Sequence, residues 1–212
     1  SPFWMQSRLW RAGMRPINAL VDITNYVMLA TGQPTHAFDS DNIQGHIIVR
    51  RAQEGEKLLL LNGKDLSLSA DDLVIADDAG VVALAGVMGG AKDSILPTTH
   101  KVILEVANFN AAGVRRTALR YDNRTEASSR YEKGLDMMNT IKAVERACEL
   151  VELLGCGEVV DGVMDVVAKE KAPTVVKLEP DKINALLGTA LRARELPMPI
   201  GVSVSYTHLT LP

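Results

Sequence analysis

The sequence predicts an α+β fold, in which a mixed, largely antiparallel sheet is flanked by helices and followed by the truncated start of a further domain. Three observations predict this architecture. Apolar residues recur at three- and four-residue steps near the start of the chain and again after residue 110, as in amphipathic helices. From His46 onward the period changes to two, and Asn62-Gly63 interrupts it as a hairpin turn does. A stretch with alternating charge and a proline, residues 168–173, reads as a linker.

Composition places the chain among soluble globular proteins with a core. Of its 212 residues 47% are apolar, yet no apolar run approaches the roughly 18 residues that a membrane span needs. A net charge of −3 argues against a broad basic face for nucleic acid, so any RNA contact must be local. Cys148 lies in a helical pattern and Cys156 between two glycines, a usage that suits a reducing cytosol, and we expect a cytoplasmic protein.

The first half of the chain predicts a helix and then several strands. Trp4 and Trp10 are expected to anchor the start onto the core, and a helix is expected between Pro16, a good first helical position, and Gly32, a good stop. Asn62-Gly63 predicts a type I′ turn. The period-two segments predict strands at 46–51, a hairpin over 56–68, and a strand pair at 72–76 and 81–85.

The second half predicts one more buried strand, two helices and a final strand. These elements are expected at 102–107, 110–120, 125–154 and 158–167. A short strand after Thr174 and a helix from Glu179-Pro180-Asp181 to Leu187 would begin the next unit. The predicted domains are 1–167, a linker at 168–173, a truncated domain start at 174–200, and an added tail of assembly origin at 201–212.

Glu105 is the most informative single residue. It lies in Val102-Ile103-Leu104-Glu105-Val106-Ala107, a run that suits a strand covered on both faces. A charge among apolar neighbours costs several kcal/mol unless something pairs with it. Glu105 therefore either turns outward or caps a neighbouring amide, or it lines a pocket and receives a donor from a ligand.

The glycine segment Gly86-Val87-Met88-Gly89-Gly90 has two interpretations. A phosphate loop fails because Gly-Lys-Ser/Thr is absent, and a dinucleotide fingerprint fails because no helical pattern follows. The segment is either a tight turn, or a place where Gly86 and Gly89 let a ligand approach the backbone.

The candidate catalytic groups are few. His36 follows a proline-stiffened loop and either makes structural hydrogen bonds or walls a pocket together with Thr24, Asn25 and Pro34. The histidines are too scattered for a zinc site, so no metal is expected. Ser128 and Ser129 are explained by helix capping, and neither cysteine has an activating neighbour in sequence, which disfavours a covalent mechanism.

Several arginines gather near Thr125-Glu126-Ala127, among them Arg116, Arg120 and Arg124. They form either a solvated helix face balanced by acidic residues or a local phosphate contact.

With these residues taken together, the chain closely resembles a known family, the bacterial phenylalanine–tRNA ligase beta subunit. The matching stretches follow the family's order and spacing over about residues 1–167: 8–18, 21–28, Gly32-Gln33-Pro34-Thr35-His36-Ala37-Phe38-Asp39, 83–90, Leu104-Glu105-Val106-Ala107, and Arg124-Thr125-Glu126-Ala127-Ser128-Ser129-Arg130-Tyr131-Glu132-Lys133-Gly134. The chain departs from the family pattern at Asp122-Asn123, where glycine-leucine is common, and at Met137, where proline follows the aspartate.

The resemblance implies the beta-subunit editing-domain fold and a hydrolytic activity that removes tyrosine wrongly attached to phenylalanine tRNA. Residues matching Thr24, Asn25, Pro34, His36, Gly86, Gly89, Glu105, Thr125 and Ala127 form the family's pocket, and the one matching Glu105 receives the tyrosine hydroxyl. The whole enzyme pairs two alpha with two beta subunits and uses ATP and Mg²⁺, but its aminoacylation centre lies in the alpha subunit. This chain is therefore expected to need no cofactor.

Two alternatives stay open beside this expectation. One is a tRNA-binding or subunit-interface module whose pocket is vestigial, and the other is a free-standing relative that edits in trans. No activated nucleophile is visible, so we expect positioning of water by Thr24, Asn25 or His36 to dominate the chemistry.

Overall fold

The computed structural model describes residues 1–92, 94–168 and 179–190. Contacts within the chain divide it into two units, Ser1–Val160 and Asp161–Pro212. The predicted limits at residues 167, 173 and 200 stay predictions. Most of the predicted linker, the short strand predicted after Thr174 and the predicted tail lie outside the described residues.

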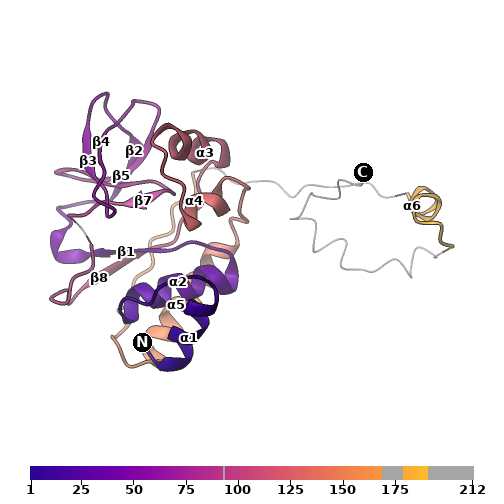
Figure 1. Ribbon diagram of the computed structural model, residues 1–212, viewed down its shortest axis with the longest axis horizontal. Helices are drawn as coiled ribbons and strands as arrows, with labels where there is room; N and C mark the ends of the chain where they lie inside the picture. The colour runs from indigo at the N-terminus through magenta and orange to yellow at the C-terminus, as the bar shows by residue number, and fades with distance from the viewer. Residues whose placement is uncertain (93, 169–178, 191–212) are drawn as a thin grey trace. The chain divides into compact units, whose positions relative to one another are not determined.

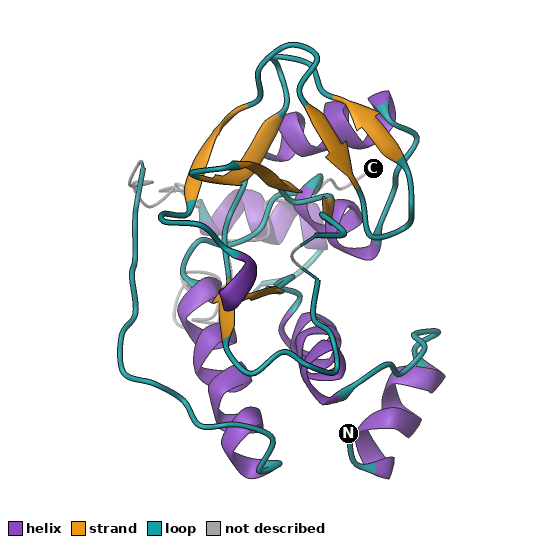
Figure 2. Ribbon diagram, turned by 90° about the vertical axis from the view of Figure 1, so that its left-hand side faces the viewer, coloured by secondary structure: helices purple, strands orange, loops and turns teal. Residues whose placement is uncertain are grey.

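In the first unit, one layer consists of helices alone and the other contains the four-stranded sheet (Figures 1 and 2). Helices α1 (Phe3–Arg11), α2 (Ala19–Thr31) and α5 (Asn139–Leu153) pack around a core of buried side chains. These side chains recur at helical spacing, as amphipathic helices require: Met5, Leu9, Ile23, Val27, Ala143, Ala147 and Leu150. The strands form the other layer, and one strand pair lies between the two.

The N-terminal anchor differs from the sequence prediction. Met5 and Leu9, four residues apart on α1, are fully buried, whereas Trp10 is 71% exposed. Trp4 is 37% exposed and meets the ring of Tyr26 edge to face, with 5.4 Å between ring centroids. The prediction that both tryptophans anchor the start is therefore wrong, because the helical phase of α1 turns Met5 and Leu9 inward instead.

Helix α2 begins three residues later than predicted. The Asn18 side chain caps it by accepting a hydrogen bond from the Val21 amide at 2.9 Å, so Pro16 lies before the helix. The predicted stop is confirmed, since Gly32 adopts a φ of 77° at the C-cap, a conformation that glycine enters without steric cost.

The main sheet has four strands in the order β2-β5-β6-β7, and all strand pairs of the described residues are antiparallel. Its strands are β2 (Ile48–Arg51), β5 (Leu73–Asp77), β6 (Gly80–Leu84) and β7 (Met88–Gly89). A hairpin of β3 (Lys57–Leu59) and β4 (Asp65–Ser67) lies beside it. The sheet and the hairpin share one core cluster with helix α3 (Ala111–Arg120), which includes Leu60, Leu68, Ile75, Leu84, Val114 and Ala118. The predicted strands and hairpin are thus present, with shifted ends.

The turn of the hairpin is not the predicted type I′, which requires positive φ at both central residues. Gly63 has a φ of 82°, but Asn62 is not among the described residues with positive φ. The Gly63 amide donates to the Leu60 carbonyl at 2.9 Å. This arrangement fits a type I turn followed by a left-handed glycine, the longer hairpin loop.

The remaining pair joins β1 (His36–Asp39), which continues into the short helix η1 (Ser40–Asn42), to β8 (Val102–Glu105). Ile103 packs against the core of the sheet, while Leu104 and Val106 pack against the core of the helical layer. Strand β8 therefore has an apolar cluster on each face, as the sequence predicts, although its first residue Val102 is 39% exposed.

Three more helices follow: α3 (Ala111–Arg120), α4 (Glu126–Tyr131) and, after a break, α5. The prediction of one helix over 125–154 is wrong, because Gly134 adopts a φ of 82° and ends the helical path. The last predicted strand is also wrong, because 158–167 form no strand and Val160, Val163 and Met164 are exposed. In the second unit, α6 (Pro180–Leu187) confirms the predicted helix.

Asp122 adopts a φ of 44°, which distinguishes it from every other described non-glycine residue. This position is one at which the sequence departs from the glycine common in the resembling family. Aspartate tolerates the left-handed conformation better than most residues, and Lys64 Nζ donates to the Asp122 carbonyl at 2.6 Å. The departure is therefore accommodated locally.

Hydrogen bonds to Asp72, which has no exposed surface, link helix α3 to the sheet. Its Oδ1 accepts hydrogen bonds from Thr117 Oγ1 at 2.9 Å and Arg120 Nη1 at 2.6 Å. Its Oδ2 accepts one from the Ser69 amide at 3.0 Å and one from the Tyr121 hydroxyl. Burial and the Asp72 carboxylate raise the pKa of Tyr121. The Asp72 carboxylate therefore accepts hydrogen bonds from four donors, three in α3 and its C-cap residue Tyr121 and one in the loop that contains Ser69.

Candidate functional site

A small cavity lies between the strand pair β1–β8, the sheet and helix α4. Its volume is about 70 Å³, room for about two water molecules at the volume that each occupies in the liquid. Its lining includes six of the nine residues predicted for the pocket: Pro34, His36, Gly86, Gly89, Glu105 and Ala127. The fold therefore gathers residues that are up to 93 positions apart in the chain, from Pro34 to Ala127.

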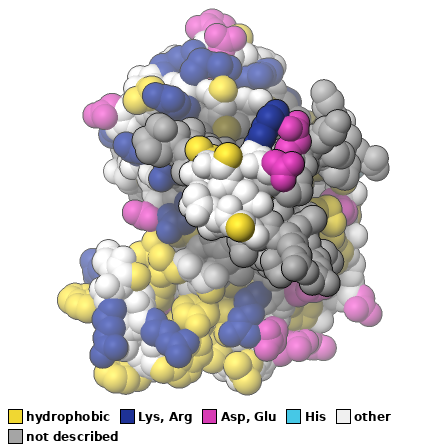
Figure 3. All heavy atoms as spheres, turned by 90° about the vertical axis from the view of Figure 1, so that its right-hand side faces the viewer, with side chains coloured by type: hydrophobic (Ala, Val, Ile, Leu, Met, Phe, Trp, Pro, Cys, Tyr) yellow, Lys and Arg dark blue, Asp and Glu magenta, His cyan; other side chains and the backbone are white. Residues whose placement is uncertain are grey.

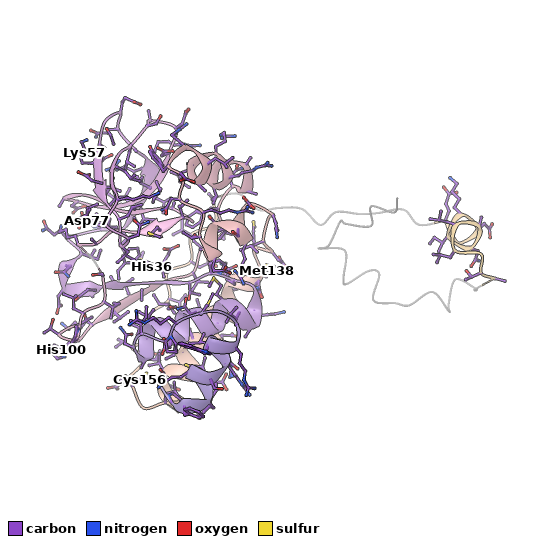
Figure 4. All side chains as sticks on the ribbon, viewed as in Figure 1. His36, Lys57, Asp77, His100, Met138 and Cys156 are labelled. Carbon is purple, nitrogen blue, oxygen red and sulfur yellow. The ribbon has the colours of Figure 1, made fainter. Side chains whose placement is uncertain are left out.

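His36 and Glu105 occupy opposite positions on β1 and β8. Directly opposed residues of an antiparallel pair place their side chains on the same face of the ribbon, and this face turns toward the cavity. Figure 4 shows His36 inside the unit, between the sheet and the helical layer. The strand register alone therefore brings the two predicted polar groups together.

The carboxyl group of Glu105 lies in an apolar setting. Burial raises its pKa from 4.5 to about 7. Within the described part of the chain, no arginine, lysine or backbone amide forms a hydrogen bond or ion pair with it. Of the two interpretations of the sequence, the outward-turning or amide-capping one does not fit, because the carboxyl lines the cavity.

His36 has its imidazole against the backbone of Gly89. A Cβ atom added at Gly89 would lie 2.5 Å from His36 Cε1 and 2.6 Å from Nε2, so any side chain there would displace the ring. The ring also meets Phe38 edge to face, with 4.6 Å between centroids. Burial lowers the pKa of His36 to about 4, which leaves the imidazole neutral at physiological pH.

This burial predicts the titration of His36. A folded-state pKa of about 4 lies below the value of 6.5 for an unperturbed histidine. Its contribution to stability is therefore present above pH 6.5 and is lost as the pH falls through 4. An NMR titration of the His36 ring in the native chain should show its midpoint near pH 4, against 6.5 for the same ring in urea. A native midpoint at the urea value would contradict the burial.

Gly86 is required by the fold itself. It has a φ of 70°, and a Cβ there would lie 2.9 Å from Val114 Cγ2 and 3.0 Å from Phe109 Cδ2. The two glycines were expected to leave room for a ligand. The structure shows that much of this room is taken by the protein's own side chains, Phe109 and Val114 at Gly86 and His36 at Gly89.

Two further rings line the cavity that the sequence did not single out, Phe109 and Tyr131. They meet at an interplanar angle of 62°, with 5.2 Å between centroids. Burial first, and then the charge of Glu105, raise the pKa of Tyr131. The sequence signal that could have identified Tyr131 is its position in the stretch 124–134, which matches the resembling family.

Three predicted pocket residues do not line the cavity. Thr125 lies just behind it, where its Oγ1 donates to the Val87 carbonyl at 2.9 Å and caps α4. Thr24 and Asn25 lie on α2. Thr24 Oγ1 donates to the Val21 carbonyl at 2.8 Å, and the Thr24 carbonyl accepts from Thr35 Oγ1 at 3.4 Å. These contacts place Thr24 next to the loop that carries His36.

The three arginines predicted to contact tRNA differ in their surroundings. Arg116 is exposed on α3. Arg120 is held by the buried Asp72, and Arg124 pairs with Glu132 at 2.6 Å while 68% of its side chain stays exposed. Arg116 and Arg124 therefore retain a surface that a phosphate could reach, whereas Arg120 has a structural partner.

Two expectations concern metals and membranes. Among the residues the structure describes, no three His, Cys, Asp or Glu side chains gather as a metal site would require. In the same residues, none of the helices combines the length and apolar character that crossing a bilayer demands.

Comparison with known proteins agrees with the resemblance in the sequence. A family model described as B3/4 domain matches residues 1–156. The phenylalanine–tRNA ligase beta subunit of Moorella thermoacetica is 47% identical over 192 residues, which are 90% of this chain and 24% of that protein. The corresponding subunit of Lactobacillus johnsonii is 48% identical over 197 residues, 92% of this chain and 24% of that protein.

The chain spans about a quarter of the length of these curated relatives. Among solved structures, an N-terminal fragment of the phenylalanyl-tRNA synthetase beta subunit from Pyrococcus horikoshii aligns at 15% identity and a TM-score of 0.47, over 83% of this chain and 52% of that one. The chain belongs to the B3/4 domain family, in the form that bacterial phenylalanine–tRNA ligase beta subunits contain.

Proposed function

We propose that the cavity binds the side chain of tyrosine wrongly attached to phenylalanine tRNA and that the chain hydrolyses the ester. The observation that carries this proposal is the carboxyl group of Glu105, which lines an apolar cavity and has no hydrogen-bond partner among the described residues. The names of the relatives support phenylalanine tRNA as the carrier of the ester.

The physical reason for a second site lies in the weak selectivity of an apolar pocket. A pocket built for phenylalanine rejects an added hydroxyl only by roughly 10²-fold, so a separate hydrolytic site that prefers the hydroxyl is useful. A hydrogen bond from that hydroxyl to a carboxylate contributes about 1.5–3 kcal/mol. Phenylalanine would leave the buried carboxylate unpaired and would therefore bind less well.

The hydrolysis needs only an oriented water. The water oxygen attacks the ester carbonyl carbon, the bond to the ribose oxygen breaks, and that oxygen leaves with a proton. His36 is neutral and can accept one hydrogen bond from the water or donate one to it, and Thr24 lies next to the loop that carries His36. We assign His36 an orienting role, so His36→Ala should slow deacylation by less than the ~10⁴-fold upper limit for removing a general base.

The names of the relatives support a proposal about the wider assembly. We propose that the chain acts within a beta subunit that pairs with an alpha subunit in an alpha2-beta2 ligase using ATP and Mg²⁺, with Arg116 and Arg124 contacting tRNA phosphates. Aminoacylation would take place in the alpha subunit. The arginines would account for a local RNA contact despite the net charge of −3.

A large side chain placed in the cavity tests whether the hydrolytic site lies there. Ala127→Trp is expected to slow removal of tyrosine from mischarged tRNA by about 10²-fold, the loss that a displacement of the reacting group by about 1 Å can cause. Ala112→Trp, on the exposed side of α3, is the matched control and should deacylate like the parent chain. Single-turnover deacylation and a filter-binding assay with the same tRNA measure the two effects.

Binding of the tRNA should stay nearly unchanged in both tryptophan variants. Undiminished tyrosine removal by Ala127→Trp would contradict the proposed pocket. If the parent chain binds tRNA but removes no tyrosine, the vestigial-pocket alternative is correct instead.

A further inference from the structure

Gln33 has a fully buried amide that lies outside the cavity lining. Its Nε2 carries two hydrogens and donates to the Ala107 carbonyl at 2.8 Å and to the Pro34 carbonyl at 3.1 Å, and it also lies 3.3 Å from the Tyr131 hydroxyl. The Tyr131 hydroxyl donates in turn to the same Ala107 carbonyl at 2.9 Å. Gln33 Oε1 is buried and has no hydrogen-bond partner within the described residues. Burial of a polar atom in this state is costly, so a compensating role is expected.

The amide completes the strand pair that carries the site. The β1–β8 ladder ends at the pair His36–Glu105. The same register, continued by two residues, sets Pro34 opposite Ala107, but proline has no N–H to donate. The Gln33 side chain supplies a donor to the Ala107 carbonyl at this place. The end of the ladder is therefore closed by a side chain instead of by the backbone.

The three segments that meet at Gln33 each carry a wall of the cavity. Gln33 precedes His36 by three residues, Ala107 follows Glu105 by two, and Tyr131 lies one helical turn after Ala127. A single amide therefore links the histidine loop, the carboxylate strand and helix α4. Loss of its donors would free these walls to move relative to one another without removing any group that lines the cavity.

We propose that Gln33 is a positioning residue of this site, and that it acts with Tyr131 to fix the carboxyl of Glu105 and the imidazole of His36 in the geometry that selects a phenol. The inference rests on the proposed function. It differs from a purely structural role, in which Gln33 would stabilise the unit without affecting the choice between tyrosine and phenylalanine.

Gln33→Met tests this, since methionine has a similar length and no amide. Deacylation of tyrosyl- and phenylalanyl-tRNA is measured under single-turnover conditions, and the His36 ring is titrated by NMR. We expect kcat/KM for the tyrosyl ester to fall by about 10²-fold, mainly through kcat, with a smaller loss for the phenylalanyl ester. The His36 midpoint should rise from about 4 toward 6.5 as water reaches the ring.

Thr117→Val is the matched control. Thr117 is also buried and also donates a side-chain hydrogen bond, 2.9 Å long, but to Asp72, outside the cavity lining. It should lower stability while leaving the tyrosine preference and the His36 midpoint unchanged. Tyr131→Phe removes only a hydroxyl, and if the two residues act as one unit, the double variant should be no slower than Gln33→Met alone.

The outcomes separate the two proposals. A parent chain that removes no tyrosine would refute the proposed function, while the His36 midpoint would still decide the positioning role. If Gln33→Met keeps the tyrosine preference and the midpoint of the parent, as Thr117→Val should, the positioning role is wrong. If Gln33→Met does not fold, Tyr131→Phe decides: the positioning role requires a lower tyrosine preference in it.

Discussion

Replacement of Glu105 by alanine is expected to lower the preference for tyrosyl over phenylalanyl esters by about 10- to 150-fold, since a hydrogen bond to a charged group contributes about 1.5–3 kcal/mol and each 1.4 kcal/mol is a factor of ten. The phenylalanyl ester should be hydrolysed as fast as before or slightly faster, because the unpaired carboxylate is gone. Parallel deacylation of tRNA carrying each amino acid measures the ratio. Glu152→Ala, at an exposed position of α5, is the control.

The pH dependence gives this prediction a second measurement. With a pKa of about 7, Glu105 is ionised above neutrality, so the tyrosine preference should rise as the pH passes through 7. The contribution of Glu105 to the stability of the fold changes with pH in the opposite direction to the tyrosine preference. The folded pKa exceeds the value of 4.5, so the contribution of Glu105 is present below pH 4.5 and is lost as the pH rises through 7. Glu105→Ala should lack both trends, and a parent chain without either would contradict the burial.

Asp72→Ala is expected to give the largest loss of stability, about 3–5 kcal/mol in the free energy of unfolding, as when one partner of a buried ion pair is removed. Arg120, Thr117, Tyr121 and the Ser69 amide would all lose their acceptor. At about 2–4 °C per kcal/mol for a chain of this size, the midpoint of thermal unfolding should fall by roughly 6–20 °C. Urea and thermal denaturation followed by circular dichroism measure both quantities.

The neighbouring Asp71 provides the control. Its carboxylate lies 3.7 Å from Arg120, but 83% of its side chain is exposed. An exposed ion pair contributes at most about 1 kcal/mol, so Asp71→Ala should be nearly neutral. Equal losses in the two variants would show that burial of Asp72 does not govern the stability of this junction.

The elements that the sequence predicted well are those with a local cause. Gly32, Gly63 and Pro180 act through their own backbone preferences. They mark the expected helix stop, the expected place of the hairpin turn, though not its expected type, and the expected helix start. The failures have non-local or competing causes. The helix expected over 125–154 is cut at Gly134, and the apolar pattern of 158–167 resembles a strand that has no described partner strand to pair with.

The candidate site was predicted through the family resemblance more than through physics. The sequence pointed to Glu105 by itself, because a lone carboxylate in an apolar run is unusual. It could not show Gln33 or Tyr131 as parts of the site, since their contacts join residues 74 and 98 positions apart. No periodicity encodes a hydrogen bond of that separation.

The short ribbon of β1 and β8 also determines how this region tolerates changes in length. The stretch between the two strands, residues 40–101, contains the whole four-stranded sheet and the hairpin. Insertions in its outer turns would leave the pairing of His36 with Glu105 intact. Deletion of a single residue within β1 would turn one of the two side chains to the opposite face. Insertions and deletions should therefore be confined to residues 40–101 and absent from β1 and β8.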